Sequence, residues 1–566
     1  MAYKHGMYAY IGNSAAKSVT SAGTVAVYVG IAPVNLVKGY KEKKVINNPT
    51  KLSNYLHAQK TVGYSVDWDS FTICEAIGAH FDNKLGNIGP IYIINVLDPE
   101  IHRKKEITTK TLNFVNGRAE FISDTVILDT ISIAEKTQDV DFSVDYNFTT
   151  GKVLINSLGS QPLAGNVTLS FYEVDTSLID ENTIIGGKTA AGDYSGIGAL
   201  PLVYNKMQGL IPNLLSCLKY NENKKVYNAM VTAIQKINDQ WDAFAVADIP
   251  LTGEADTNTD IYKYSGDVTG TFYTSEEIKI GITAFANRLL SKPIGTVSAV
   301  NTTANTVTIG SGNSETLTSF GTVKKTVETT IDTNEEAMAW KVDNAYDSER
   351  TKVFWPQVYD AGTERIFHCS TLGIVEFMRV DNEHKNVPCE TCSNKEIPVT
   401  SQYFGKNSTN QGFDRVEANN LNEVGISTAY SDGGKMKLWG GHTAKFRYGS
   451  DDDVRCVFDT YMRTLMHLEN TFQKRHGAEI DKPFTPAMRD SILNYEQNEL
   501  DNLVAIGALV GEPKIYFLAS ENSTEDMIQG DFKFNIPVTT TPQFKSATAE
   551  VNYTDEGLSA LTEGVE

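Results

Sequence analysis

One glycine-rich segment contains the residue types of a phosphate-binding loop, and another contains those of a turn that presents a nucleophilic serine. In both segments the spacing of the residues differs from the spacing that the motif requires. Residues 186–189 read Gly-Gly-Lys-Thr, like the end of a phosphate-binding loop, but such a loop needs a glycine six residues before its lysine, and position 182 is asparagine. Residues 192–196 read Gly-Asp-Tyr-Ser-Gly, which misses by one position the first glycine of the Gly-x-Ser-x-Gly turn that exposes a nucleophilic serine. We therefore expect no nucleotide cofactor and no catalytic residue for acyl transfer.

Cysteine and histidine spacing is the test for a metal site. Cys389 and Cys392 have the spacing of half a zinc site, but a tetrahedral site needs a second pair, and only His368, Cys369 and His384 lie near them in sequence. The nine histidines form no His-x-x-x-His or His-Glu pair. Six cysteines are too few in so long a chain for a disulfide framework. We expect reduced thiols, no bound metal and no other cofactor.

The charge of the chain excludes further classes of protein. Its 566 residues carry 50 Lys+Arg against 70 Asp+Glu, a net charge of −20, which repels a nucleic-acid backbone and an anionic membrane surface. No apolar run approaches the ~18 residues of a membrane span, and residues 1–10 lack the basic and then apolar pattern of a secretory signal. The sequence predicts no direct nucleic-acid binding, no membrane anchor and folding in a cytoplasm. The two ends differ in sign, because residues 1–60 are rich in lysine and the chain after Lys545 carries only acidic charges.

The first hundred residues predict a parallel α/β unit. Residues 24–31 and 91–97 are continuous apolar runs, as in strands that are buried on both faces of a sheet. Between them, apolar residues recur at helical spacing from Phe71 to Phe81, and Ser70 is a candidate N-cap. The α/β pattern returns with a helix over residues 226–241 and a buried strand over 243–247.

Two stretches interrupt this pattern with short alternating segments. Residues 104–178 predict a small all-β insert, because turn residues recur every 8–12 positions. Residues 292–330 are rich in Thr, Ser, Asn and Gly and predict a minor β insert or loop.

The last third predicts two long amphipathic helices and two strand-like segments. One helix spans about 454–472, and the next begins with Thr485 as N-cap and Pro486 in its first turn. Apolar residues then alternate strictly over 532–538 and again over 547–553. Such strands at a chain end need a partner to cover their edges.

Without catalytic motifs, the chain is best interpreted as a structural protein, and four stretches resemble contractile-tail sheath proteins. They are residues 21–35, 180–202, 370–394 and 425–443. The third keeps the family's Arg-x-Asp spacing at Arg379 and Asp381, and the fourth keeps its Leu-Trp-Gly pattern at Leu438, Trp439 and Gly440. The Cys389/Cys392 pair and the 292–330 insert depart from the family pattern.

The resemblance implies an α/β (α+β multidomain) fold: a discontinuous subtilisin-like sheath core without the protease triad, an inserted β-sandwich-like domain and extended terminal arms. The expected parts are an N-terminal arm (1–20), core segments (21–103, 179–291 and, with the C-terminal helices, 331–530), the β domain (104–178), the minor insert (292–330) and a C-terminal arm (531–566).

The resemblance also implies a mechanical role and its partners. Subunits of this family stack as hexameric rings around a tail tube, between a baseplate and a tail terminator, and contract to drive the tube through a bacterial envelope. That places the protein in a virion tail assembled in the host cytoplasm. Terminal arms add strands to sheets of neighbouring copies in this family. The arm residues expected to do so here are Tyr3, Tyr8, Tyr10, Phe532, Phe534, Ile536, Val538, Val551 and Tyr553.

Two alternatives remain open. Another self-assembling protein, such as an S-layer or envelope component, would form planar arrays instead of tubes. A subtilisin-like serine protease would need Asp, His and Ser in that order with glycine-rich surroundings, and it would react with a fluorophosphonate probe.

Overall fold

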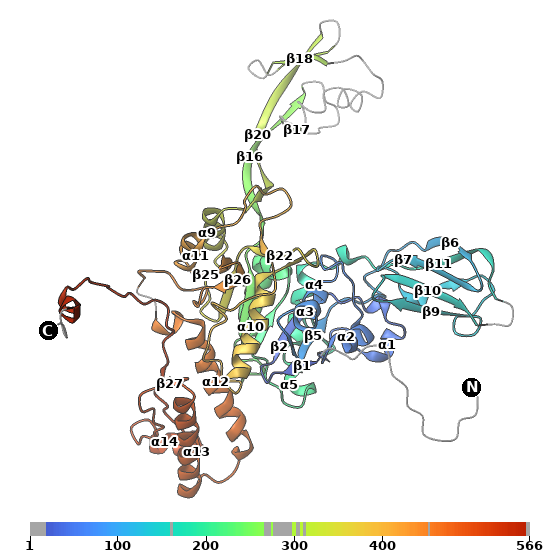
Figure 1. Ribbon diagram of the computed structural model, residues 1–566. Helices are drawn as coiled ribbons and strands as arrows, with labels where there is room; N and C mark the ends of the chain where they lie inside the picture. Colours follow the sequence, from blue (N-terminus) through green and yellow to red (C-terminus); the bar gives the residue numbers. More distant parts are fainter. Residues whose placement is uncertain are drawn as a thin grey trace, which may run out of the picture. The chain divides into compact units, whose positions relative to one another are not determined.

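The computed structural model describes most of the chain, and the α/β organisation expected from the sequence is present (Figure 1). The described residues are 18–158, 162–264, 273–274, 297–301, 306–309, 313–450 and 453–561. The chain divides into two compact units, residues 250–331 and the remainder. Among the described residues, no helix is long and apolar enough to cross a membrane.

An eight-stranded mixed sheet forms the centre of the larger unit. In spatial order its strands are β26 (Lys435–Trp439), β25 (Ile426–Asp432), β21 (Thr351–Phe354), β15 (Phe244–Asp248), β14 (Leu214–Ser216), β2 (Ala26–Gly30), β5 (Ile91–Asn95) and β3 (Thr50–Leu52). The six strands from β25 to β5 are parallel, and an antiparallel strand closes each edge. Every residue of β2, β5, β14 and β15 is buried, which explains why these segments are continuous apolar runs.

Helices cover this sheet. Helices α3 (Ile73–Phe81) and α10 (Cys369–Glu383) contact each other and the central strands. The other helices of this region are α1 (Tyr40–Lys43), α2 (Tyr55–Val62), α4 (Glu181–Ile185), α5 (Leu202–Lys206), α6 (Lys224–Ala233), α9 (Asn334–Asp343) and α11 (Arg415–Asn422).

Two helix boundaries differ from the sequence prediction. Helix α3 begins at Ile73, so the residue before it is Thr72 and not Ser70. The Thr72 hydroxyl accepts the Ile31 N–H at 3.1 Å and makes no cap hydrogen bond to the helix. Helix α6 ends at Ala233, eight positions before the expected end at Trp241. Ile237 and Trp241 instead form a β-bridge across a tight turn, and both side chains are buried. Their spacing resembles that of a helix because both positions face the core, although this segment is not helical.

Residues 108–171 form two three-stranded antiparallel sheets with a core of their own. One sheet has the order β7 (Arg118–Ile122), β10 (Lys152–Ser157), β9 (Phe142–Asn147), and the other β6 (Thr108–Phe114), β11 (Gly165–Phe171), β8 (Ser132–Ile133). Alternate residues such as Val153, Ile155 and Leu169 are fully buried between the sheets. This is the packing that a β-sandwich requires.

The second unit is built on a long antiparallel ladder. Its strands in spatial order are β17 (Tyr273–Thr274), β16 (Thr252–Tyr264), β20 (Asn313–Thr330), β19 (Thr306–Ile309) and β18 (Val297–Asn301). The unit begins at Pro250, whereas the sequence places the start of this insert at residue 292. The reason is that β16 pairs with β20 and therefore leaves the α/β unit with it, a long-range pairing that local composition does not reveal.

The C-terminal region consists of helices α12 (Asp459–His476), α13 (Pro486–Ala505) and α14 (Thr524–Gln529). The predicted start of α13 is confirmed, since the Thr485 hydroxyl accepts the Met488 N–H at 3.2 Å and Pro486 opens the helix. Small sheets complete the unit: β1 (Val19–Ser21) with β4 (Asn87–Gly89), β12 (Gly187–Lys188) with β13 (Tyr194–Ser195), β23 (Arg365–Phe367), β22 (Gln357–Asp360) and β24 (Ser401–Tyr403), and β27 (Leu509–Val510) with β28 (Thr539–Thr540).

Candidate functional site

The carboxyl ends of the central strands bring together a serine, a histidine and three carboxylates. Ser370 lies in the first turn of α10, and Asp248 ends β15. The Ser370 hydroxyl and its backbone N–H both donate to Asp248, the latter at 2.9 Å. His368 instead contacts Glu75 of α3, with 2.7 Å between Nδ1 and Oε2. Its Nε2 lies 3.1 Å from Gln357 and 3.4 Å from Glu222.

This arrangement does not make a nucleophile. Ser370 is fully buried, and its hydroxyl is bonded to a carboxylate and not to an imidazole. Burial by itself lowers the pKa of His368, but the carboxylates of Glu75 and Glu222 raise it by a larger amount. The net pKa therefore lies well above its usual range, and the ring is a cation at neutral pH. A protonated imidazole cannot act as a general base. The carboxylates of Glu75 and Asp248 instead cap the start of α10, which suits the partial positive charge of a helix N-terminus.

The Leu438–Gly440 segment ends beside a buried ion pair, which the Gly440 carbonyl contacts. Lys352 of β21 and Asp459 of α12 are both fully buried, with 2.7 Å between Nζ and Oδ2. The ammonium also donates to the carbonyl oxygens of Gly440 at 2.6 Å and His442 at 3.3 Å. Three acceptors match the three hydrogens of the ammonium, so Lys352 joins the sheet, the turn after β26 and α12.

Gly440 is a glycine for a geometric reason. Its φ is 125°, and a Cβ there would overlap Asn422 Oδ1 and lie 2.8 Å from Ser427 Oγ. Its neighbour Trp439 donates from Nε1 to Asn419 at 2.8 Å, and the Arg415 guanidinium lies over the indole ring at 4.8 Å. Leu438 is fully buried. The three motif residues therefore hold α11 and the end of the sheet together.

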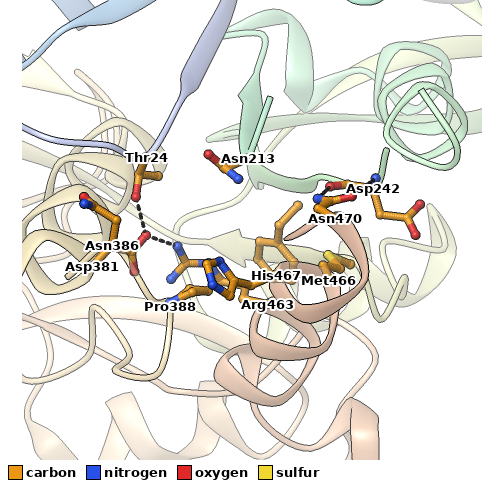
Figure 2. A pocket seen from close by; sticks show the side chains of 11 residues that line it. Thr24, Asn213, Asp242, Asp381, Asn386, Pro388, Arg463, Met466, His467 and Asn470 are labelled. Atoms are coloured by element: carbon orange, nitrogen blue, oxygen red, sulfur yellow. Dashed lines mark hydrogen bonds and ion pairs between the residues drawn. The ribbon is translucent and has the colours of Figure 1, made fainter. Parts of the chain in front are cut away.

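Arg379 and Asp381 point to different partners. Arg379 donates to the Gly86 carbonyl at 2.6 Å and lies 3.1 Å from Glu376. Asp381 is buried and accepts from the Thr24 hydroxyl at 2.8 Å and from Arg463 of α12 at 2.5 Å (Figure 2). Asp381 thus connects the segment before β2 with α12.

A small polar cavity lies beside this pair (Figure 2). Its volume is about 30 Å³, which is far below that of a small-molecule site. Besides Asp381 and Arg463, its walls include Asn213, Asp242 and Asn470. Asn470 of α12 bonds both the N–H and the carbonyl of Asp242, at 3.0 and 2.7 Å. The cavity lies between α12 and the residues that precede β2, β14 and β15.

The buried His442 predicts acid sensitivity. Its ring is stacked between Phe446 and Phe458, and burial lowers its pKa to about 4. Because the folded pKa lies below the unfolded value of about 6.5, the stability is present above pH ~6.5 and is lost as pH falls toward 4. Between pH 7 and 5 this amounts to roughly 2 kcal/mol. The melting temperature of the wild type should therefore fall more steeply over this range than that of His442→Phe, and parallel slopes would contradict the assignment.

The neighbouring cysteines Cys389 and Cys392 are protonated thiols. Burial raises the pKa of Cys389 to about 11 and that of Cys392 to about 12. Cys392 is fully buried and Cys389 partly so, and both are free. A protonated thiol is a poor nucleophile, which favours packing over redox chemistry for this pair.

The predicted arm residues that the structure describes fall into three groups. Phe532 and Phe534 pack within the chain, Phe532 on Phe484 with ring centres 3.9 Å apart and Phe534 on Phe517 at 5.3 Å. Ile536 and Val538 are half-buried against the end of α13. Val551 and Tyr553 are 93% and 87% exposed. Tyr3, Tyr8 and Tyr10 lie outside the described residues.

Neither alternating C-terminal segment is a regular strand in the described chain. Residues 532–538 are extended, with one bridge between Asn535 and Tyr516, and β28 pairs with β27 just beyond them. The alternation over 532–538 therefore reflects one face packed on the α12–α13 region. Residues 547–553 are irregular and exposed. What remains is the short ladder of β27 with β28 and the single bridge of Tyr516 with Asn535, followed by an exposed segment that ends in a 3-10 helix over Glu556–Leu561.

Several residues of the site were not found from the sequence. Lys352, Asp459 and Arg463 are charged residues in otherwise apolar stretches, which is the one local signal that they carry. Their partners are 107 and 82 positions away in the sequence, so spacing could not pair them.

Comparisons with known proteins confirm the resemblance to tail sheath proteins. No protein-family profile matches the chain. The tail sheath protein of Burkholderia phage BcepMu is 22% identical over 570 residues, covering 96% of this chain and 98% of that protein. The tail sheath protein of Escherichia phage P2 is 26% identical over 150 residues, 26% of this chain and 36% of that protein. A chain in the cryo-EM structure of the anti-feeding prophage baseplate shares the fold with a TM-score of 0.50 and 13% identity, covering 98% of this chain and all of that one.

Proposed function

We propose that this chain, which is similar to tail sheath proteins over nearly its whole length, is the structural subunit of a contractile tail sheath. The observation that carries the proposal is the match to the BcepMu tail sheath protein across 96% of the chain. Copies stack as hexameric rings around a tail tube protein, bounded by a baseplate and a terminator. The sheath is part of a virion tail that is assembled in the host cytoplasm.

The subunit works through its surfaces and is not an enzyme. The geometry around Ser370 supports this view, because its hydroxyl is committed to Asp248 and the only nearby imidazole among the described residues is held as a cation by Glu75. The α/β core is the subtilisin-like sheath domain of the family, and residues 108–171 are its inserted sandwich. A serine that reacted with a fluorophosphonate probe would favour the protease alternative.

Assembly uses β-augmentation between copies. The exposed apolar residues of the C-terminal end, among them Val551 and Tyr553, support this step because an extended segment with unpaired backbone groups and large apolar side chains is suited to a partner. The ribbon of β27 and β28 offers a two-stranded template of this chain to which the arms of neighbouring copies add. The N-terminal arm with Tyr3, Tyr8 and Tyr10 supplies a further strand.

Negative-stain microscopy of the purified, concentrated protein tests the proposal. Hollow tubes of uniform diameter are the expected result. Planar arrays would favour an envelope protein instead. Protein that stays dispersed at high concentration, and also in the presence of tail tubes and baseplates, would contradict the sheath assignment.

A further inference from the structure

Residues near the N-terminus and residues near the C-terminus contact the same loop, which follows α10. On the N-terminal side, the Gly23 N–H donates to Asn386 Oδ1 at 2.7 Å, and the Thr24 hydroxyl donates to Asp381 at 2.8 Å. The approach is tight, since a Cβ on Gly23 would lie 2.6 Å from Asn386 Cγ. The segment that leads into β2 is therefore fixed to residues 381–386, which lie at the end of α10.

The C-terminal side is fixed to the same loop three residues beyond Asn386, at Cys389. The Gln543 side-chain amide donates to the Cys389 carbonyl at 3.1 Å and to the Thr460 hydroxyl at 3.0 Å. Two residues on, the Lys545 ammonium lies over the rings of Phe446 and Tyr448, at 5.7 and 5.9 Å. Beyond Ser546 the chain is exposed. Gln543 and Lys545 thus mark the point at which the C-terminal arm leaves the subunit.

Helix α12 ties the two attachments together. Arg463 donates to Asp381 at 2.5 Å, and the Thr464 hydroxyl donates to the Pro388 carbonyl at 3.1 Å. Arg463 and Asp381 are 3% and 2% exposed, so their ion pair is shielded from solvent and both partners are costly to separate. The loop itself is closed by the Asn386 N–H, which donates to the Asp381 carbonyl at 2.6 Å. Most displacements of the residues at one attachment would therefore also displace the residues at the other.

We propose that residues 381–392 and the first turns of α12 form a bracket that fixes the roots of both terminal arms and couples their positions. Asp381, Asn386 and Arg463 are positioning residues within it. The mechanical meaning of the bracket rests on the proposed function: when a neighbouring copy pulls on one arm, part of the load reaches the other arm of the same subunit through this loop, beside the path through the pairing of β1 with β4. A chain of packed, hydrogen-bonded residues can carry coupling of this kind, and the hydrogen bonds above form such a chain.

Proteolysis of the unassembled protein tests the coupling from the N-terminal side. Asn386→Ala removes the acceptor of the Gly23 N–H, and we expect trypsin to cut after Lys545 several-fold faster than in the wild type, because Lys545 must leave its two rings to be cleaved. The matched control is Asn47→Ala. Asn47 also has a positive φ, 50° against 66° for Asn386, and also accepts a glycine N–H, from Gly196 at 3.0 Å. Equal cleavage rates in the two variants would overturn the proposal.

A second measurement tests the coupling from the C-terminal side, with a substitution at Gln543 that leaves the core intact. Gln543→Ala should speed hydrogen exchange several-fold at the Gly23 amide and leave the Gly196 amide unchanged. Unchanged exchange at Gly23 would show that the two roots are independent. Both measurements are made on monomers, so their outcome does not depend on whether tubes form, and a failed sheath assignment remains distinguishable from a failed bracket.

Discussion

A chain that ends at Ser546 is expected to remain a folded monomer that forms no tubes. Residues 547–561 contribute exposed side chains such as Val551 and Tyr553, so their removal deletes little packing within the subunit. The anchors of the arm at Gln543 and Lys545, and the pairing of Thr540 in β28, are all retained. A truncation at residue 540 would also remove these anchors, so a loss of tubes could then result from a less stable subunit and not from the missing arm. Circular dichroism, the melting temperature and negative-stain images of the concentrated protein measure the two effects separately.

Single substitutions in the arm show whether main-chain pairing is responsible. Val551→Pro removes a backbone donor and should prevent tube formation if residues 547–553 add to a sheet of another copy. Val551→Thr keeps the donor and a β-branched side chain, and it should assemble like the wild type. Tubes from the truncated chain, or from the proline variant at wild-type yield, would contradict a role for this arm in assembly.

The sheet was predictable where its strands are buried on both faces. The apolar runs at 24–31, 91–97 and 243–247 correspond to β2, β5 and β15, because a central parallel strand needs apolar residues at successive positions. The ends of elements were less predictable. Trp241 continues the helical spacing of α6 but lies in a turn, since burial alone produced the pattern.

Features that depend on contacts between residues far apart in the sequence could not be predicted. The insert expected to begin at residue 292 belongs to a unit that begins at Pro250, because β16 pairs with β20, and the polar sequence of β16 carries no local sign of that pairing. The Leu438–Gly440 motif was visible in the sequence, but its reason was not. That reason is the carbonyl of Gly440, which accepts from Lys352, a residue 88 positions earlier.

Lys352→Met is expected to be the most destabilising single change in the α/β unit. The substitution removes the one cation that Asp459 contacts among the described residues, and it leaves that carboxylate buried with the carbonyl oxygens of Gly440 and His442. Removing one partner of a buried ion pair costs about 3–5 kcal/mol, because the remaining charge has lost both its partner and its water. A drop of several degrees in the melting temperature is the expected measurement.

Two companion variants decide whether the buried charge is the cause. Lys225→Met breaks the Lys225–Glu181 pair, which has a similar separation of 2.8 Å but a lysine side chain that is 68% exposed. Exposed pairs contribute at most about 1 kcal/mol, so this variant should melt close to the wild type. The double change Lys352→Met with Asp459→Leu removes the orphaned carboxylate and should recover part of the lost stability, since an apolar replacement of a whole buried pair is often nearly neutral. If the double variant melted no higher than Lys352→Met, the loss would come from packing around β21 and α12, and the ion pair would not be what holds α12 to the sheet.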